Sequence, residues 1–166
     1  GSFTVTAWIR TTANTLANQR ILVDDENNTS GFGLSLGDPG AGMLRLRSRG
    51  TASSTTLDSA AVINNNTWYF IAFGVNTATQ VKTLYVYDAA GTQLAALSAA
   101  YTEASFGSDS GIVSIGGETN GASGSENTNS YGFAGNIDEV RVYSAPLTPW
   151  QLGQVRKYPS VSVAYL

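Results

Sequence analysis

Five consecutive residues carry side-chain oxygen atoms, and they are the first feature of this sequence that suggests chemistry. Asp24, Asp25, Glu26, Asn27 and Asn28 form an unbroken run. Calcium takes roughly six to eight hard oxygen ligands in flexible geometry, and such a run together with backbone carbonyls provides part of that number. Asp and Asn are also common turn formers on solvated loops. Both interpretations, a calcium loop and a plain surface turn, therefore stay open.

A long polar segment, residues 116–130, is the second candidate. It is rich in Gly, Ser, Asn and Glu, and it is close to the length at which loops without secondary structure become uncommon unless they have a function. Sugar sites combine flat aromatic rings with polar groups that hydrogen-bond hydroxyls. The candidate ligand-binding residues here are Asn120, Glu126, Asn127, Asn129 and Tyr131. For any single one of them, an ordinary solvent-facing position is the simpler explanation.

A stripe of arginines is the third candidate. Alternation along one predicted strand places two leucines on one side and Arg45, Arg47 and Arg49 on the other. Guanidinium groups bind carboxylate or sulfate with two parallel hydrogen bonds, so the stripe is suited to acidic glycans. We expect Tyr85 and Tyr87 to join Arg45 and Arg47 in the ligand site if their strand faces point into the same concave surface.

The composition excludes several classes of function. The 166 residues include no Cys and no His, which removes disulfides, thiolate nucleophiles, cysteine zinc sites and the commonest general base. The net charge of −3 argues against nucleic acid as a partner. No apolar run approaches the roughly 20 residues that cross a bilayer, so membrane insertion is not expected. The start, Gly1-Ser2-Phe3, has neither an initiator Met nor a signal peptide, which suggests a processed or excised chain.

Short strands must position these groups. Eighteen Gly and 13% charged residues are typical of many turns between strands, and the length fits one domain. Alternating or continuous apolar patterns predict strands at residues 3–10, 20–23, 31–36, 43–49, 68–75, 82–87, 93–97, 112–115 and 136–143. The acidic run is then the loop between the second and third strands. The strand at 68–75 is apolar throughout, so we expect it in the middle of a sheet.

Three further features complete the predicted elements. Residues 88–91 form a turn in which Gly91 is available for positive φ, a hairpin pattern. Thr148 as N-cap and Pro149 at the first helical position predict one short helix near the end of the chain. Residues 160–166 alternate again and predict a final strand. Trp8, Trp68 and Trp150 are expected in the core.

Residues 133–148 resemble the closing signature of laminin-G-like jelly rolls, a Gly-x-Ile-Asp-Glu-Val-Arg-Ile-Tyr strand followed by Ala-Leu and a short helix. Residues 3–9, 67–72 and 84–87 resemble the family's early strand, its Trp-bearing central strand and the strand before its hairpin. The resemblance covers about residues 3–157. It implies an all-β fold of the concanavalin-like kind, a two-sheet antiparallel β-sandwich (jelly roll) with one short C-terminal helix, as a single domain over residues 1–166.

The resemblance has one departure that bears on assembly. Family members usually have one or two more strands ahead of the segment with which this chain begins, so a sheet is expected to be short of a strand. Three explanations stay open: the module comes from a longer polypeptide, residues 159–166 complete their own sheet, or a neighbouring copy donates a strand.

The resemblance also implies a calcium site. Pentraxins are similar in fold to this family, and their calcium loops match this chain at Asp24, Asp25, Asn27 and Glu118. Asp138 is a further candidate ligand, or alternatively a hydrogen-bond partner of a neighbouring loop. The full pentraxin ligand set is absent.

Catalysis is not expected. Related glycoside hydrolases use two carboxylates that flank the scissile bond, commonly from a Glu-x-Asp-x-x-Glu strand, and this sequence has none. The adjacent Asp138 and Glu139 point to opposite faces of a pleated strand. The sequence therefore predicts a non-catalytic carbohydrate-binding or adhesion module of an extracellular or surface protein, secreted or on a virion, which binds a glycan or cell-surface polysaccharide. The alternative is a structural subunit of a virion, filament or surface layer, assembled by strand sharing with copies of itself or neighbouring domains.

Overall fold

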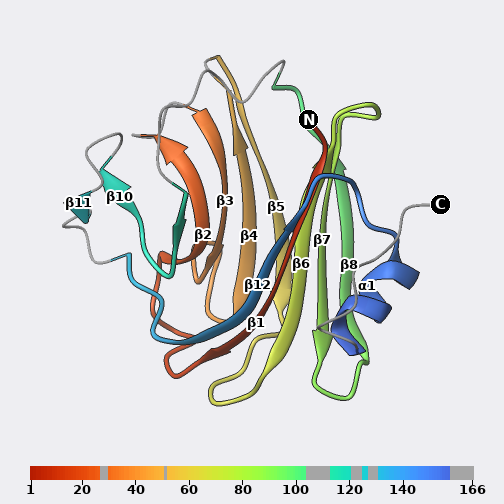
Figure 1. Ribbon diagram of the computed structural model, residues 1–166. Coiled ribbons are helices and arrows are strands. Elements are labelled where there is room, and N and C mark those ends of the chain that lie inside the picture. The colour runs from red at the N-terminus through yellow and green to blue at the C-terminus, as the bar shows by residue number, and fades with distance from the viewer. Residues whose placement is uncertain (27–29, 51, 104–112, 121–124, 127–130, 158–166) are drawn as a thin grey trace.

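The computed structural model describes residues 1–26, 30–50, 52–103, 113–120, 125–126 and 131–157, without the side chains of residues 25, 26, 119, 120, 125 and 126. Figure 1 shows two antiparallel sheets packed face to face, with one helix on the outside. The described chain is therefore an antiparallel β-sandwich, as the sequence predicts.

Each of the two large sheets has five strands. The first sheet has the order β12 (Gly135–Tyr143), β1 (Phe3–Thr11), β6 (Tyr69–Asn76), β7 (Val81–Asp88) and β8 (Gln93–Ala100). The second sheet has the order β5 (Ser54–Ala61), β4 (Met43–Arg49), β3 (Ser30–Leu36), β2 (Gln19–Glu26) and β9 (Ser114–Ile115). A small hairpin of β10 (Thr119–Asn120) and β11 (Ser125–Glu126) forms a third sheet. Strand β6 lies in the middle of the first sheet, which confirms that prediction.

The core lies between the two large sheets. Alternate residues of the strands point inward, and Ile9, Ile71 and Leu84 of the first sheet meet Leu34 and Leu46 of the second. The inward leucines of β4 leave its arginines on the outer face, as the alternation predicts.

Helix α1 (Pro149–Lys157) covers part of the outer face of the first sheet (Figure 1). Its Leu152 and Val155 pack against Phe70 and Tyr87. Trp150 lies on the other side of the helix and is 70% exposed, so its prediction as a core residue is wrong. Across the described residues, no helix is long and apolar enough to span a membrane.

Three predicted boundaries need correction. Strand β2 continues to Glu26, so the first three residues of the predicted acidic loop are strand. Strand β5 (Ser54–Ala61) was not predicted, because its inward positions include Thr and Ser in place of a run of apolar residues. Residues 116–130, predicted as one loop, include the β10–β11 hairpin. Gly91 has φ of 97°, which confirms the predicted turn, and the predicted strand at 160–166 lies outside the described residues.

Strand β12 forms one edge of the first sheet and carries a bulge. Its register against β1 shifts between Thr6 and Trp8, and Glu139 has φ of 51°. Asp138, Glu139 and Arg141 also place charges on this edge strand. Bulges and charged side chains are the usual means of preventing an edge from pairing with another strand.

Candidate functional site

Polar residues form a row across the outer face of the second sheet. Arg20 of β2 lies opposite Ser35 of β3, and Ser35 lies opposite Arg45 of β4. Arg45 in turn lies opposite Asp58 of β5. The residues next to them in sequence include Ile21, Leu34, Leu44 and Leu57, which point into the core, so these four side chains point outward.

A second row beside it contains a depression. Val23, Gly33 and Arg47 lie opposite one another on β2, β3 and β4. Gly33 has no side chain, so the surface is low between its two neighbours. The depression is small and partly open to solvent, and its lining residues are Arg20, Val23, Gly33, Ser35, Asp38 and Arg47.

Arg20 is held by four contacts. Its Nε donates to Glu118 Oε2 over 2.6 Å, and its Nη1 donates to Asp38 Oδ2 over 3.0 Å. Its Cζ lies 4.5 Å from the centre of the Tyr131 ring, and its backbone N–H donates to the Tyr131 carbonyl over 2.9 Å. Arg20 therefore has two carboxylate partners, and it fixes both ends of the segment between Glu118 and Tyr131 to the sheet.

Arg45 is paired within its own row. Its Nε and Nη2 donate to the two oxygens of Asp58 over 2.8 and 2.7 Å, a bidentate geometry. The hydrogen bonds from Arg45 lower the pKa of Asp58. Arg45 does not line the depression.

Arg47 differs from Arg20 and Arg45, which are both paired with carboxylates. It is half-buried, and among the described residues it makes no hydrogen bond or ion pair. Burial lowers its pKa, and the neighbouring charges of Arg49 and Arg45 lower it further. The charge of Asp38 offsets only part of this effect. A guanidinium stays protonated in proteins, so Arg47 is a cation without a hydrogen-bonded partner among the described residues, and an anion would stabilise it.

Asp38 adds an unused acceptor. Its Oδ2 accepts hydrogen bonds from Arg20 and from Ser35 Oγ, whereas its Oδ1 is buried and has no partner among the described residues. Buried polar atoms are nearly always hydrogen-bonded, so an unpaired one calls for an explanation. The depression thus combines an unpaired cation with a lining carboxylate that is only half satisfied.

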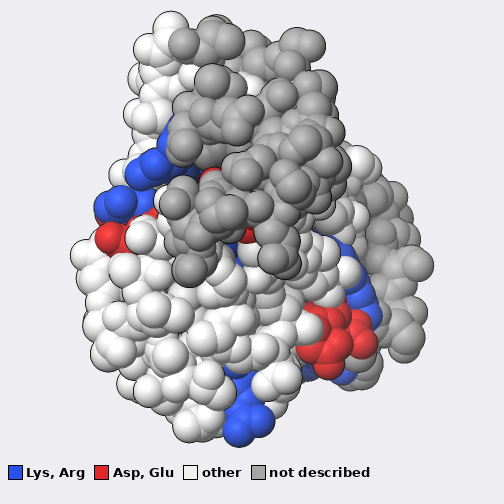
Figure 2. Space-filling model, turned by 90° about the vertical axis from the view of Figure 1, so that its left-hand side faces the viewer, with Lys and Arg blue, Asp and Glu red and all other residues white. Residues whose placement is uncertain are grey.

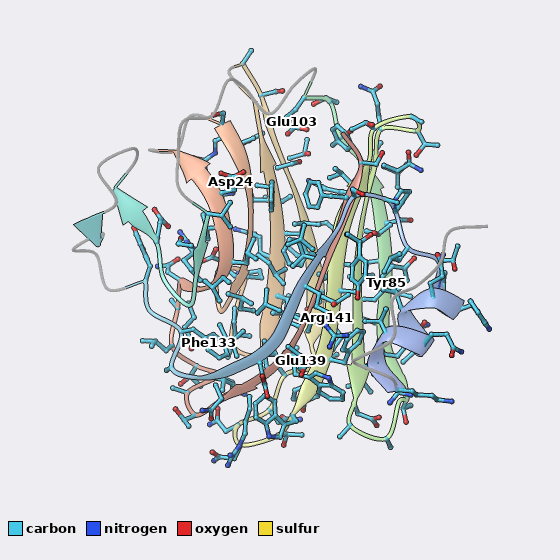
Figure 3. All side chains as sticks on the ribbon, in the orientation of Figure 1. Asp24, Tyr85, Glu103, Phe133, Glu139 and Arg141 are labelled. Atoms are coloured by element: carbon cyan, nitrogen blue, oxygen red, sulfur yellow. The ribbon has the colours of Figure 1, made fainter. Side chains whose placement is uncertain are left out.

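Of the predicted ligand residues, Arg45, Arg47 and Tyr131 lie at this face. Tyr85 and Tyr87 lie on β7 of the first sheet, where Tyr87 packs beneath α1 and Tyr85 lies against the same apolar cluster (Figure 3). The outer faces of the two sheets point in opposite directions. The expectation that the two tyrosines share one surface with Arg45 and Arg47 is therefore wrong.

The remaining predicted ligand residues belong to the hairpin segment. Asn120 and Glu126 lie on β10 and β11, but their side chains are not among those described. Asn127 and Asn129 lie outside the described residues. Their roles stay predictions.

The described members of the predicted calcium set are separated. Asp24 lies opposite Phe32, which packs against the core, so Asp24 is on the inner side of the second sheet. Glu118 lies on the outer side with Arg20. Asp138 is exposed on β12 of the other sheet, where the Glu139 N–H donates to its Oδ1 over 2.8 Å.

These three carboxylates therefore do not form one metal site. No group of three or more Asp and Glu residues that could hold a metal ion occurs in the part of the chain that the structure describes. The Asp25 side chain and Asn27 lie outside that part. Calcium binding stays a prediction.

Sequence reasoning missed Arg20 and Asp38, which shape the site most. Arg20 and Val23 are three residues apart, so simple alternation places them on opposite faces. A register shift between Arg20 and Leu22 brings both to the outer face. For Asp38 the sequence showed only an Asp-Pro-Gly turn.

Figure 2 views the molecule from the side of the second sheet and the β10–β11 hairpin. Lys and Arg atoms lie there beside Asp and Glu atoms, so the visible surface is of mixed charge and not uniformly basic.

A family model described as the concanavalin A-like lectin/glucanases superfamily matches residues 1–153. The chain belongs to this superfamily. Membership agrees with the jelly-roll sandwich and with the laminin-G-like resemblance of the sequence. No curated protein matches the chain.

Several solved structures of the superfamily's fold are similar. The sialidase CBM40 of Ruminococcus gnavus bound to α2,3-sialyllactose is 22% identical, with a TM-score of 0.69 over 93% of this chain and 82% of that one. A SAP-like pentraxin of Limulus polyphemus is 16% identical, with a TM-score of 0.62 over 93% and 69%. Domains LG4-5 of the mouse laminin α1 chain are 17% identical, with a TM-score of 0.54 over 86% and 36%. At these identities the likeness shows the fold.

Proposed function

We propose that this domain is a non-catalytic carbohydrate-binding module, and that the outer face of its second sheet binds an acidic glycan through Arg47. The observation that carries the proposal is the half-buried guanidinium of Arg47, which lines a depression and has no partner among the described residues. A carboxylate of a sugar can accept two parallel hydrogen bonds from such a group. Binding would compensate the one unpaired charge of the depression.

The floor of the depression is a small apolar surface. Gly33 and Val23 offer a low apolar surface beside Arg47, and Ser35 and Asp38 border it with polar groups. Sugar sites combine such apolar surface with a few placed polar groups. The CBM40 structures similar to this chain contain α2,3- and α2,6-sialyllactose, each with one carboxylate, and they make this ligand the natural first probe.

The carboxylates at the site support binding without hydrolysis. Glycoside hydrolysis needs two carboxyl groups that flank the scissile bond. Asp38 and Glu118 both accept hydrogen bonds from the same guanidinium, that of Arg20. We therefore assign them to holding Arg20 and not to acid or nucleophile roles.

We place this module outside the cell or on a surface, as an adhesion part of a larger protein. The alternative of a subunit assembled by strand sharing has no observation in its favour at β12, whose bulge and charges oppose pairing.

Titration calorimetry with sialyllactose and with neutral lactose tests the proposal. We expect binding of sialyllactose, weaker or no binding of lactose, and a loss of about tenfold or more in affinity for Arg47→Gln, because a hydrogen-bonded charge contributes roughly 1.5–3 kcal/mol. An unchanged melting temperature of the variant would show that the fold persists. Failure of every acidic glycan to bind, or equal affinity of variant and wild type, would refute the proposal.

A further inference from the structure

The arginines of the second sheet differ in what they can offer a ligand. We infer that this face receives a single anionic group, so that the glycan carries one negative charge at the contact and is not a polyanion such as a sulfated polysaccharide. This inference rests on the proposed function and narrows its ligand class.

Two arginines of the face are already neutralised. Arg20 bonds to Glu118 and Asp38, whose side chains are only 10% and 12% exposed. Arg45 bonds to Asp58 in bidentate geometry. Such pairs have no unbalanced charge to attract an anion, and separating them would leave a carboxylate unpaired.

Arg49 is also not available. It is only 9% exposed, and it already has an interaction partner. Among the described arginines of this face, only Arg47 is both unpaired and in contact with the depression.

Carboxylates border the same surface. Asp38 lines the depression beside Arg47. Glu118 accepts a hydrogen bond from Arg20, and Asp58 accepts one from Arg45. A second anionic group of a ligand would approach these carboxylates without a free cation to meet it, and like charges repel at such separations.

The dependence of affinity on salt tests the inference. A contact that neutralises one charge gives a slope of log K against log salt near or below about one, whereas a polyanion that releases several counterions gives a slope several times steeper. The probes are sialyllactose, which has one carboxylate, and a heparin octasaccharide. We expect sialyllactose to bind with a slope of about one or less, and the octasaccharide to bind no more tightly than sialyllactose.

A charge-matched pair of variants separates Arg47 from the rest of the stripe. Arg47→Gln should lower the affinity for sialyllactose about tenfold or more. The double variant Arg45→Gln/Asp58→Asn removes one positive and one negative charge, leaves the net charge unchanged, and should stay within about threefold of wild type.

The possible failures are distinguishable. Tighter, steeply salt-dependent binding of the octasaccharide, or a double variant as impaired as Arg47→Gln, would overturn the inference and leave acidic-glycan binding intact. If no acidic glycan binds the wild type, or if Arg47→Gln binds as the wild type does, the proposed function falls and the inference falls with it.

Discussion

Lys82 is the least expected residue of the interior. It is fully buried between the sheets, and its Nζ donates to Ser48 Oγ over 3.1 Å and to Thr55 Oγ1 over 2.8 Å. Thr55 Oγ1 in turn donates to Glu103 Oε2 over 3.2 Å. Burial lowers the pKa of Lys82 to about 8, and the charge of Glu103 only partly offsets it. The hydrogen bonds to Ser48 and Thr55 do not fully offset the cost of burying the ammonium group. Lys82 therefore destabilises the fold while it is protonated.

The stability of the protein should consequently rise with pH above 8. The folded pKa of Lys82 is about 8, below its ordinary value of 10.5, so the unfolded chain binds the proton more tightly between these values. Unfolding free energy rises with pH wherever the unfolded state binds more protons. Lys82→Met should abolish this rise, because it removes the group whose pKa lies between these values.

Urea unfolding at pH 7, 8.5 and 9.5 measures this effect. In the folded state the range stays below the titration of Tyr87 and Tyr101, since burial raises the pKa of both, and the tyrosines of the unfolded chain contribute equally to wild type and Lys82→Met. Parallel pH dependences for wild type and Lys82→Met would show that Lys82 does not cause the rise.

Gly33 sets the depth of the depression. A Cβ at this position would lie 3.4 Å from Val23 Cγ2, an ordinary van der Waals contact, so Gly33→Ala should change the unfolding free energy by less than about 0.5 kcal/mol. The added methyl group nevertheless raises the floor beside Arg47. We expect a loss of about threefold or more in affinity for sialyllactose, measured by calorimetry. An unaltered affinity would mean that the sugar does not contact this floor.

At the scale of elements, Arg20 connects the second sheet to the segment that carries β10 and β11. It bonds to Glu118 and stacks on Tyr131, at the two ends of that segment. Arg20→Gln would leave Glu118 and Asp38 without their cation while both are largely buried. We expect a loss of about 3 kcal/mol in unfolding free energy, together with weaker glycan binding.

Arg20→Lys is the matched control. It restores the charge but not the forked geometry, so it should recover part of the stability in urea unfolding. If Arg20→Gln unfolds at the same urea concentration as the wild type, the segment is held by other contacts.

Elements with a regular pattern of apolar residues or a clear cap could be predicted from the sequence, and elements without one could not. Strands β1, β4 and β6 follow clear apolar patterns, and Thr148 and Gln151 cap α1 with reciprocal hydrogen bonds of 2.8 and 3.3 Å. Strand β5 lacks such a pattern because its inward side is rich in Ser and Thr.

The candidate site was only partly predictable for a related reason. The arginine face of β4 follows from local alternation and was predicted. The pair of Arg20 and Glu118 joins residues 98 positions apart, and the bulge that turns Arg20 outward leaves no mark on the sequence. Which sheet each strand joins is also a long-range property, so the error over Tyr85 and Tyr87 was of the same kind.

At the scale of the whole molecule, the outer faces of the two sheets differ: helix α1 covers part of the first, and the second carries the proposed binding site. Helix α1 packs on the first sheet and buries Tyr87, whereas the second sheet presents its polar rows and the depression. Because these rows depend on the register of β2, β3, β4 and β5, the binding surface is a property of the assembled sheet. We therefore expect a ligand to contact the second sheet and to leave the first sheet unaffected.

Mapping of NMR chemical shifts during titration with sialyllactose tests this central claim most directly. We expect the largest changes at the amides of Val23 and Gly33 and at the guanidinium Nε–H of Arg47, and we expect that lactose does not reproduce the change at Arg47. Changes concentrated on β7 and α1 around Tyr85, with Arg47 unaffected, would contradict the account.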